Sequence, residues 1–216
     1  MSEQVAAQGL DPAVDQVLAE YEARAEREER AMREVPPSQI GSRRDEWLLA
    51  VGRPTGMLLN ILAKECRAQN IVEIGTSYGY STVWLAEAAR ATGGRVISLE
   101  IHPLKVAYAR ERLAAAGLAR CVEFRVGDAL ESLESLAVGV DFVLIDLWKD
   151  LYIPSFERIY AKLSDGAIIV ADNMLQPAIW RADAEAYRAH VRARAGMSSV
   201  LLPVGSGVEV SRYRGD

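Results

Sequence analysis

Three oxygen-bearing side chains follow two apolar runs of the chain and together could hold a metal ion. Asp146 directly follows the run Phe142–Ile145, and Asp172 and Asn173 directly follow the run Ala167–Ala171. Two carboxylates and one amide are hard oxygen ligands, which suit Mg²⁺ or Ca²⁺ and do not suit zinc. The alternative interpretation is that both acids lie in solvated turns. Because each acid ends an apolar run of four or more residues, the metal site is the favoured interpretation.

Lys149 follows Asp146 by three residues and is a candidate general base. A divalent cation nearby would disfavour the protonated ammonium, so the amine could accept a proton near neutral pH. The alternative is a surface lysine that pairs with Asp150.

Three more acids end apolar runs earlier in the chain, at Glu73, Glu100 and Asp128. Gly75 and Gly79, after the first of them, would let the chain turn tightly and approach a ligand. Their spacing differs from G-x-G-x-x-G, so a dinucleotide pyrophosphate is not predicted. Glu73 suits a positively charged cofactor such as S-adenosylmethionine (SAM), and Glu100 could accept hydrogen bonds from both ribose hydroxyls.

Asp128 has two interpretations. It could meet the adenine amino group of the same cofactor, or it could form a capping box with Glu131 at the start of a helix. Acids at the ends of three successive strands favour the cofactor site over three unrelated local roles.

These side chains need a sheet that brings strand ends to one edge. From Asn70 onward, short apolar runs alternate with helical stretches, which indicates βαβ units and a mostly parallel sheet with helices on both faces. Strands are expected near Ile71–Ile74, Arg95–Leu99, Val122–Val126, Phe142–Ile145 and Ala167–Ala171, then as a hairpin of Ser198–Val204 and Val208–Tyr213 turning at Gly205-Ser206-Gly207. Helices are expected near Arg43–Ala50, Gly56–Arg67, Tyr80–Arg90, Leu104–Ala116, Ala129–Leu136, Ile153–Leu163 and around Trp180–Val191. Asp165-Gly166 is expected to mark the join before the fifth strand, and the arginines of Arg181–Arg194 to form a solvated helix face.

The N-terminal part predicts a separate helix over Pro12–Glu34, which Val35-Pro36-Pro37 ends. Its apolar residues recur at helical spacing and form one stripe, made of Val14, Val17, Leu18 and Tyr21. We therefore expect a helical extension over residues 1–42 and one α/β domain over residues 43–216. Whether the extension lids a pocket or pairs two subunits stays open at this point.

Composition excludes several classes of protein. The net charge of −5 and the interspersed charges of the 216 residues leave no basic face for nucleic acid. Cys66 and Cys121 form no metal or disulfide pattern, which indicates free thiols in a reducing compartment. Met1–Leu10 lacks the pattern of a signal peptide, and no apolar stretch reaches the roughly 20 residues that span a bilayer. We expect a soluble, cytoplasmic protein without a membrane partner.

The motifs resemble those of the cation-dependent O-methyltransferases that use SAM, and among them most closely the catechol O-methyltransferases. The resemblance runs from about Asp45 to the C-terminus, and its most specific segments are Ile145–Asp150 and Ala171–Asn173. It implies the class I methyltransferase fold, a Rossmann-like α/β sheet of seven strands that ends in an antiparallel hairpin. Asp45-Glu46-Trp47 and Val51-Gly52 also resemble the stretch that closes over substrate and cofactor in the animal enzyme.

The resemblance implies a role for each matching residue. Magnesium, or another divalent cation such as Ca²⁺ or Mn²⁺, would bind Asp146, Asp172 and Asn173, and Lys149 would be the general base. Trp47, Trp148 and Pro177 would form the hydrophobic substrate walls. The resemblance also implies Val51, Ser81, Glu100 and Asp128 as SAM contacts. We further expect Glu73, Gly75, Tyr80, Gly127, Ala129 and Asp146 to contact SAM.

The chain departs from the family pattern at two places. A histidine of the animal motif is Leu147 here, and no acid lies in Met197–Gly207 to grip the second catechol oxygen. The predicted function is methyl transfer from SAM to a hydroxyl of a small catechol-like diol, by a protein that could form a homodimer. Two alternatives stay open: a methyltransferase for another hydroxylated natural product or an amine, and a non-catalytic relative that only binds the cofactor.

Overall fold

Seven strands pair into one sheet in this computed structural model, which describes residues 9–36 and 41–215. The spatial order is β3-β2-β1-β4-β5-β7-β6; pairs among the first five strands are parallel, and β7 runs antiparallel to β5 and β6. The strands are β1 (Asn70–Ile74), β2 (Arg95–Glu100), β3 (Val122–Val126), β4 (Val140–Ile145), β5 (Leu163–Ala171), β6 (Met197–Leu202) and β7 (Val208–Tyr213). The predicted seven-stranded fold with its terminal hairpin is confirmed.

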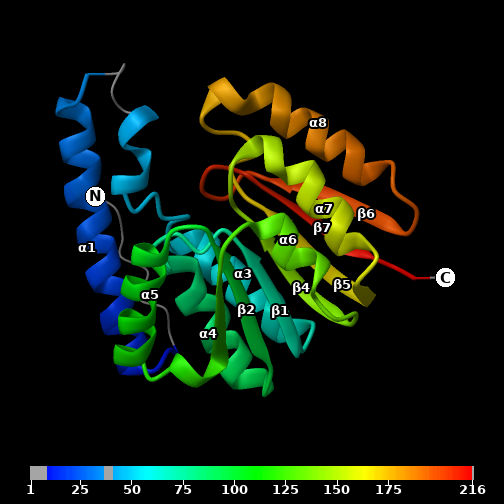
Figure 1. Ribbon diagram of the computed structural model, residues 1–216, viewed down its shortest axis with the longest axis horizontal. Coiled ribbons are helices and arrows are strands. Elements are labelled where there is room, and N and C mark those ends of the chain that lie inside the picture. The colour runs from blue at the N-terminus through cyan, green and yellow to red at the C-terminus, as the bar shows by residue number, and fades with distance from the viewer. Residues whose placement is uncertain (1–8, 37–40, 216) are drawn as a thin grey trace.

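Helices cover both faces of the sheet (Figure 1). They are α1 (Pro12–Glu34), α3 (Arg53–Glu65), α4 (Tyr80–Thr92), α5 (Pro103–Ala115), α6 (Ala129–Glu134), α7 (Tyr152–Tyr160) and α8 (Arg181–Arg192). Short 3₁₀ turns are η1 (Gly41–Glu46), η2 (Ala119–Cys121), η3 (Lys149–Leu151) and η4 (Ala178–Trp180). Helices α1, α3, α4 and α5 pack on one face, and α6, α7 and α8 on the other.

Each face of the sheet has its own hydrophobic cluster because side chains alternate along a strand. On β4, Phe142 and Leu144 belong to the cluster under α4, whereas Val143 and Ile145 belong to the cluster under α7. All four side chains are fully buried. Burial on both faces explains why β4 is a continuous apolar run in the sequence.

The order in which strands are added to the sheet reverses between β1 and β4. These two strands are parallel neighbours in the sheet, but β2 and β3 lie between them in the sequence. Connections on opposite faces leave a crevice at the carboxyl ends of strands placed in this way, and open α/β sheets bind ligands there. The fold therefore directs attention to the residues that follow β1 and β4.

Two sequence expectations about local structure are wrong. β5 begins at Leu163, not at Ala167, and Asp165-Gly166 lies inside it, where the pairing with β4 shifts register between Val140 and Phe142. The turn-forming pair thus lies at an irregularity inside the strand and not at its boundary. The helix expected over Arg43–Ala50 is a 3₁₀ turn over Gly41–Glu46 followed by chain without regular secondary structure.

Other expectations hold or lie outside the description. Helix α1 spans Pro12–Glu34 as predicted, and Cys66 and Cys121 are free thiols. Within residues 9–36 and 41–215, no helix has the length and apolarity needed to cross a bilayer. Residues 1–8 and 37–40, part of the expected extension over residues 1–42, lie outside the described residues. The boundary between residues 42 and 43 stays a prediction.

Candidate active site

The loop after β1 passes directly over the end of β4. Gly75 has φ +104°, and a Cβ added to it would lie 2.0 Å from the backbone oxygen of Asp146. The amide of Asp146 donates to the Ile74 oxygen at 2.9 Å, so the two strand ends are held together. Glycine is required at position 75 because any side chain would push the loop away from Asp146.

A pocket opens beside this crossing. One wall is the segment 45–51, called the strap below, and the other is the loop from Gly75 to Ser81 together with Asp146. Its lining is Leu48, Leu49, Ala50, Val51, Gly75, Thr76, Ser77, Tyr78, Tyr80, Ser81 and Asp146. The structure thus brings five of the predicted cofactor residues to one pocket: Val51, Gly75, Tyr80, Ser81 and Asp146.

Glu73 lies behind this wall and is fully buried. Its two carboxylate oxygens accept hydrogen bonds from the hydroxyls of Ser81 (2.6 Å), Thr82 (2.6 Å) and Ser98 (2.5 Å). Burial raises the pKa of Glu73 to about 7, against the opposing effect of these hydroxyl donors. Glu73 therefore anchors the start of α4 to β1 and β2, and a direct cofactor contact by its side chain stays a prediction.

Glu100 ends β2 beside the same loop. Its carboxylate accepts hydrogen bonds from the backbone amides of Ser77 (2.7 Å) and His102 (3.0 Å), and its carbonyl accepts one from Gly127 (2.9 Å). The side chain is largely buried. The loop after β1 and the loop after β2 are thus held together by the acid that was expected to bind the ribose.

Asp128 and Ala129 start α6. The exposed Asp128 carboxylate accepts hydrogen bonds from the amides of Leu130 (2.7 Å) and Glu131 (3.1 Å). This is the helix-capping role that the sequence left open. Contacts of Gly127, Asp128 and Ala129 with adenine stay predictions, since none of these residues lines the pocket described above.

The proposed metal ligands converge where β4 and β5 end side by side, with Ile145 paired to Ala171. Asp172 is 1% exposed, and its Oδ1 is buried without a hydrogen-bond partner among the described residues. Burial and, as a smaller cause, the negative charge of Asp146 raise the pKa of Asp172 to about 8. Burial also raises the pKa of Asp146, which the positive charge of Lys149 opposes. Two buried acids this close are less easily ionised than free ones, and a cation beside them would favour their charged forms.

These residues fit a divalent cation. Oδ1 of Asp172 is a buried acceptor without a hydrogen-bond donor among the described residues. The side-chain amide of the next residue, Asn173, adds a neutral oxygen. Asn173 has φ +55°, a left-handed conformation that asparagine tolerates better than most residues. Among the described residues, no group of three His, Cys, Asp or Glu side chains is placed to hold a metal, so the ligand set would have to include this amide.

Lys149 extends from η3 into the same cluster and is buried. Its Nζ donates to the carbonyl oxygen of Asp172 at 3.2 Å and to Oδ1 of Asn173 at 3.4 Å. It also donates to the hydroxyl of Tyr152. Lys149 is therefore not the surface residue of the alternative interpretation.

The three expected substrate-wall residues come from three segments at this edge. Trp47 lies in the strap and is buried, with the guanidinium of Arg43 5.3 Å from the ring centroid. Trp148 is 45% exposed after β4, and Pro177 is exposed after β5. Their role as one wall stays a prediction.

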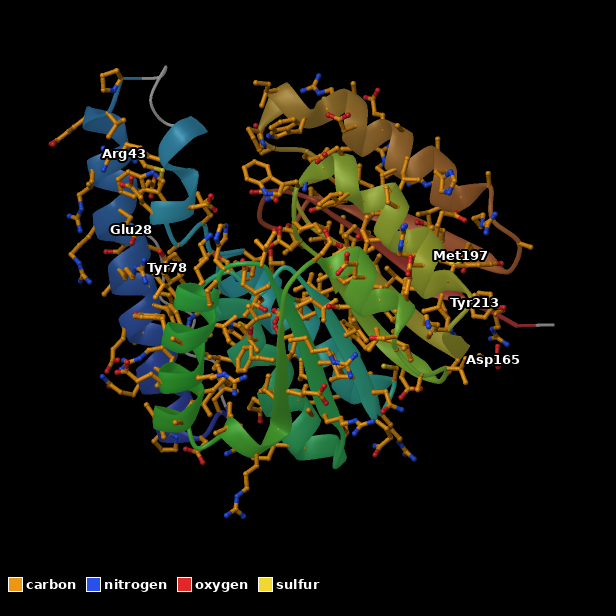
Figure 2. The ribbon with its side chains drawn as sticks, viewed as in Figure 1. Glu28, Arg43, Tyr78, Asp165, Met197 and Tyr213 are labelled. Carbon is orange, nitrogen blue, oxygen red and sulfur yellow. The ribbon has the colours of Figure 1, made fainter. Side chains whose placement is uncertain are left out.

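Several contacts of the site were not foreseen. Tyr152 follows Lys149 by one helical turn, a spacing that could have suggested their contact. Glu28 of α1 accepts a hydrogen bond from the Leu48 amide at 2.5 Å, and the Tyr21 hydroxyl donates to the backbone carbonyl oxygen of Tyr78 at 2.6 Å. In Figure 2, Glu28 and Tyr78 lie near one another along α1. No sequence pattern indicates these long-range pairs.

The strap is also tied to α5. Asp45 accepts a hydrogen bond from Nζ of Lys105 at 2.9 Å and lies 3.4 Å from Nε2 of His102, while Tyr78 donates to the Asp45 carbonyl at 3.1 Å. The pocket wall formed by the strap is therefore held from two helices.

Comparison with known proteins agrees with this geometry. A family model described as O-methyltransferase matches residues 24–211. The catechol O-methyltransferase of Niastella koreensis is 37% identical over 132 residues, 59% of each chain. That of Mycobacterium tuberculosis is 40% identical over 129 residues, 59% of this chain and 58% of that protein. The alignments thus span less than two thirds of these relatives. The structure of the O-methyltransferase TomG from Streptomyces achromogenes with SAM is 28% identical, has a TM-score of 0.74 and covers 95% of this chain and 91% of that one.

Proposed function

Because this chain belongs to the O-methyltransferase family, we propose that it transfers the methyl group of SAM to a hydroxyl of a small, catechol-like vicinal diol. The observation that carries the proposal is the buried Oδ1 of Asp172, an acceptor without a partner among the described residues, next to Asp146 and Lys149. A buried carboxylate oxygen without a donor is the kind of acceptor that a bound cation would satisfy.

The methyl donor belongs in the pocket between the strap and the loop Gly75–Ser81. Asp146 lines this pocket and also belongs to the acid cluster, so the pocket adjoins the cluster. The relative TomG binds SAM, which supports the same ligand here. Carboxyl groups at Asp146 and Glu100 suit the ammonium and sulfonium of SAM better than they suit a phosphate.

Asp146, Asp172 and Asn173 would hold a divalent cation, for which Mg²⁺ is the first candidate and Ca²⁺ or Mn²⁺ the alternatives. Such a cation would lower the pKa of a substrate hydroxyl and would help to orient a diol. The residues present fit such a group, as the orphaned oxygen of Asp172 indicates.

The chain's own residues then carry the chemistry. Lys149 accepts the proton of the acceptor hydroxyl at Nζ. The acceptor oxygen forms a bond to the methyl carbon while the bond from that carbon to sulfur breaks, and the sulfonium becomes a neutral thioether. Opposite charges cancel along this path, so positioning the oxygen in line with the carbon–sulfur bond matters more than stabilising new charge.

The test is methyl transfer from labelled SAM to a panel of catechols and of hydroxylated compounds without a vicinal diol, with Mg²⁺ or with EDTA. We expect label on a catechol oxygen only with the metal, and a loss on the order of 100-fold or more in Asp146→Asn and Asp172→Asn. Asp150→Asn, a neighbouring exposed acid, is the matched control and should keep its activity.

Other results would change the proposal. Full activity in EDTA would remove the metal from it. Transfer only to compounds without a diol would move the substrate to another hydroxylated natural product or an amine. SAM binding without transfer to any acceptor would support a non-catalytic relative. A cytoplasmic location, the absence of nucleic-acid and membrane partners, and a homodimer stay predictions.

A further inference from the structure

Tyr152 is a buried residue of the site that the proposed chemistry does not use. It starts α7, three residues after Lys149, and is 0% exposed. Its hydroxyl accepts a hydrogen bond from Nζ of Lys149 and donates one to the carbonyl oxygen of Asp172 at 3.2 Å. The hydroxyl therefore joins the amine to the end of β5.

We propose that Tyr152 is a positioning residue that holds Nζ of Lys149 in the place from which it reaches the acceptor hydroxyl. This inference rests on the proposed function, in which Lys149 is the base. Lysine carries its amine on a flexible four-carbon stem, so an amine that must meet one proton gains from fixed partners.

The partners of Nζ define one location. It donates to the Tyr152 hydroxyl, to the carbonyl of Asp172 at 3.2 Å and to Oδ1 of Asn173 at 3.4 Å. The last two groups belong to Asp172 and Asn173, which are themselves proposed metal ligands in the loop after β5. Of the three, only Tyr152 is a side chain with no other proposed role in the chemistry.

The tyrosine itself is held rigidly. Its ring packs edge-on against Tyr187 of α8, with centroids 5.5 Å apart and an interplanar angle of 82°. Tyr187 packs in the same way against Phe156 of α7, at 6.2 Å. The aromatic cluster restricts the ring, and the Asp172 carbonyl restricts the hydroxyl. Tyr152 can therefore hold the amine of Lys149 at a fixed position relative to the end of β5.

Tyr152→Phe removes only the hydroxyl and leaves the ring packing intact. We expect kcat to fall about tenfold or more, while the KM and Kd for SAM and the melting temperature stay close to wild type. The matched control is Tyr160→Phe in the same helix. The Tyr160 hydroxyl donates to the carbonyl oxygen of Ala195 at 2.7 Å, so this variant also loses one hydrogen bond to the backbone, but not one that involves Lys149, and kcat should stay unchanged.

A double-mutant cycle decides whether Tyr152 acts through Lys149. If it does, adding Tyr152→Phe to Lys149→Met should lower kcat by less than twofold, since the amine that the hydroxyl positions is already gone. An equal tenfold loss in both backgrounds would overturn the inference, as would wild-type kcat in Tyr152→Phe. Full activity of Lys149→Met, in contrast, would remove the base from the proposed function itself.

Discussion

At the scale of single residues, the Glu73 carboxylate has a structural role next to the proposed SAM pocket. Its carboxylate is fully buried, and hydroxyls from the first turn of α4 and from β2 donate to it. A buried carboxylate without such donors would cost several kcal/mol. The N-terminus of α4 also favours negative charge at this place. Glu73 thereby joins β1, β2 and α4 at the base of the proposed SAM pocket.

The pKa of Glu73 predicts a pH dependence of stability. In the folded chain it is raised from 4.5 to about 7, so between these values the folded state keeps a proton that the unfolded state has lost. Its contribution is therefore fully present below pH 4.5 and lost as the pH rises through 7. Relative to Glu73→Gln, the wild type should lose about 3 kcal/mol of unfolding free energy across this range. Urea unfolding of both proteins from pH 5 to pH 8 measures this, and parallel pH profiles would contradict it.

At the scale of elements, α1 settles what its apolar stripe covers. Val14, Val17, Leu18 and Tyr21 are all buried in the cluster shared with α4 and α5. The same helix reaches both walls of the pocket, through the hydrogen bond from Tyr21 to Tyr78 and the one from the Leu48 amide to Glu28. Helix α1 thus supports both walls of the proposed SAM pocket through hydrogen bonds, called the α1 brace below.

Loss of the hydrogen bond between Glu28 of the α1 brace and the Leu48 amide should weaken SAM binding. We expect Glu28→Ala, which leaves the Leu48 amide without its acceptor, to raise the Kd for SAM about three- to tenfold, the worth of roughly one hydrogen bond. The kcat at saturating SAM should stay near wild type because Glu28 is remote from the acid cluster. Calorimetric titration with SAM provides the measurement. Glu29→Ala, which removes an exposed acid paired with Arg33, is the control, and an equal effect in both variants would refute the brace.

At the scale of the whole molecule, an ion cluster joins α8 to the terminal hairpin. Glu209 of β7 is 0% exposed; its carboxylate lies 2.8 Å from Arg192 and 3.7 Å from Arg188 and accepts a hydrogen bond from Ser199 at 2.5 Å. Arg181–Arg194 is therefore not simply the solvated face expected from the sequence. Two of its arginines neutralise a buried acid across the sheet surface.

Removing the cations should destabilise the fold more than removing the acid. Arg188→Gln with Arg192→Gln leaves the buried Glu209 carboxylate uncompensated, which should cost on the order of 3–5 kcal/mol. Glu209→Gln leaves two partly exposed arginines that water can solvate, so about 1–2 kcal/mol is expected. Urea unfolding of the three proteins at one pH compares these costs. The explanation fails if Glu209→Gln is as unstable as the double variant.

The sequence by itself determined most of the elements and the class of the fold. Burial on both faces makes β4 a continuous apolar run, and one-sided packing gives α1 its stripe, so both are visible locally. Acids that directly follow apolar strands marked the ligand edge, because parallel strands end together there. The motifs Ile145–Asp150 and Ala171–Asn173 then indicated the family that the comparison confirms.

Only the tertiary structure decided which groups those side chains meet. The sequence placed Glu73 near the cofactor, but the hydroxyls of Ser81, Thr82 and Ser98 reach it only once β2 and α4 pack against β1. The contact of Glu28 with Leu48 likewise spans 20 residues of chain. Local periodicity reports whether a residue is buried, whereas hydrogen bonds and ion pairs depend on which distant segments close the same space. That choice is made by the packing of the whole domain, and no window of sequence contains it.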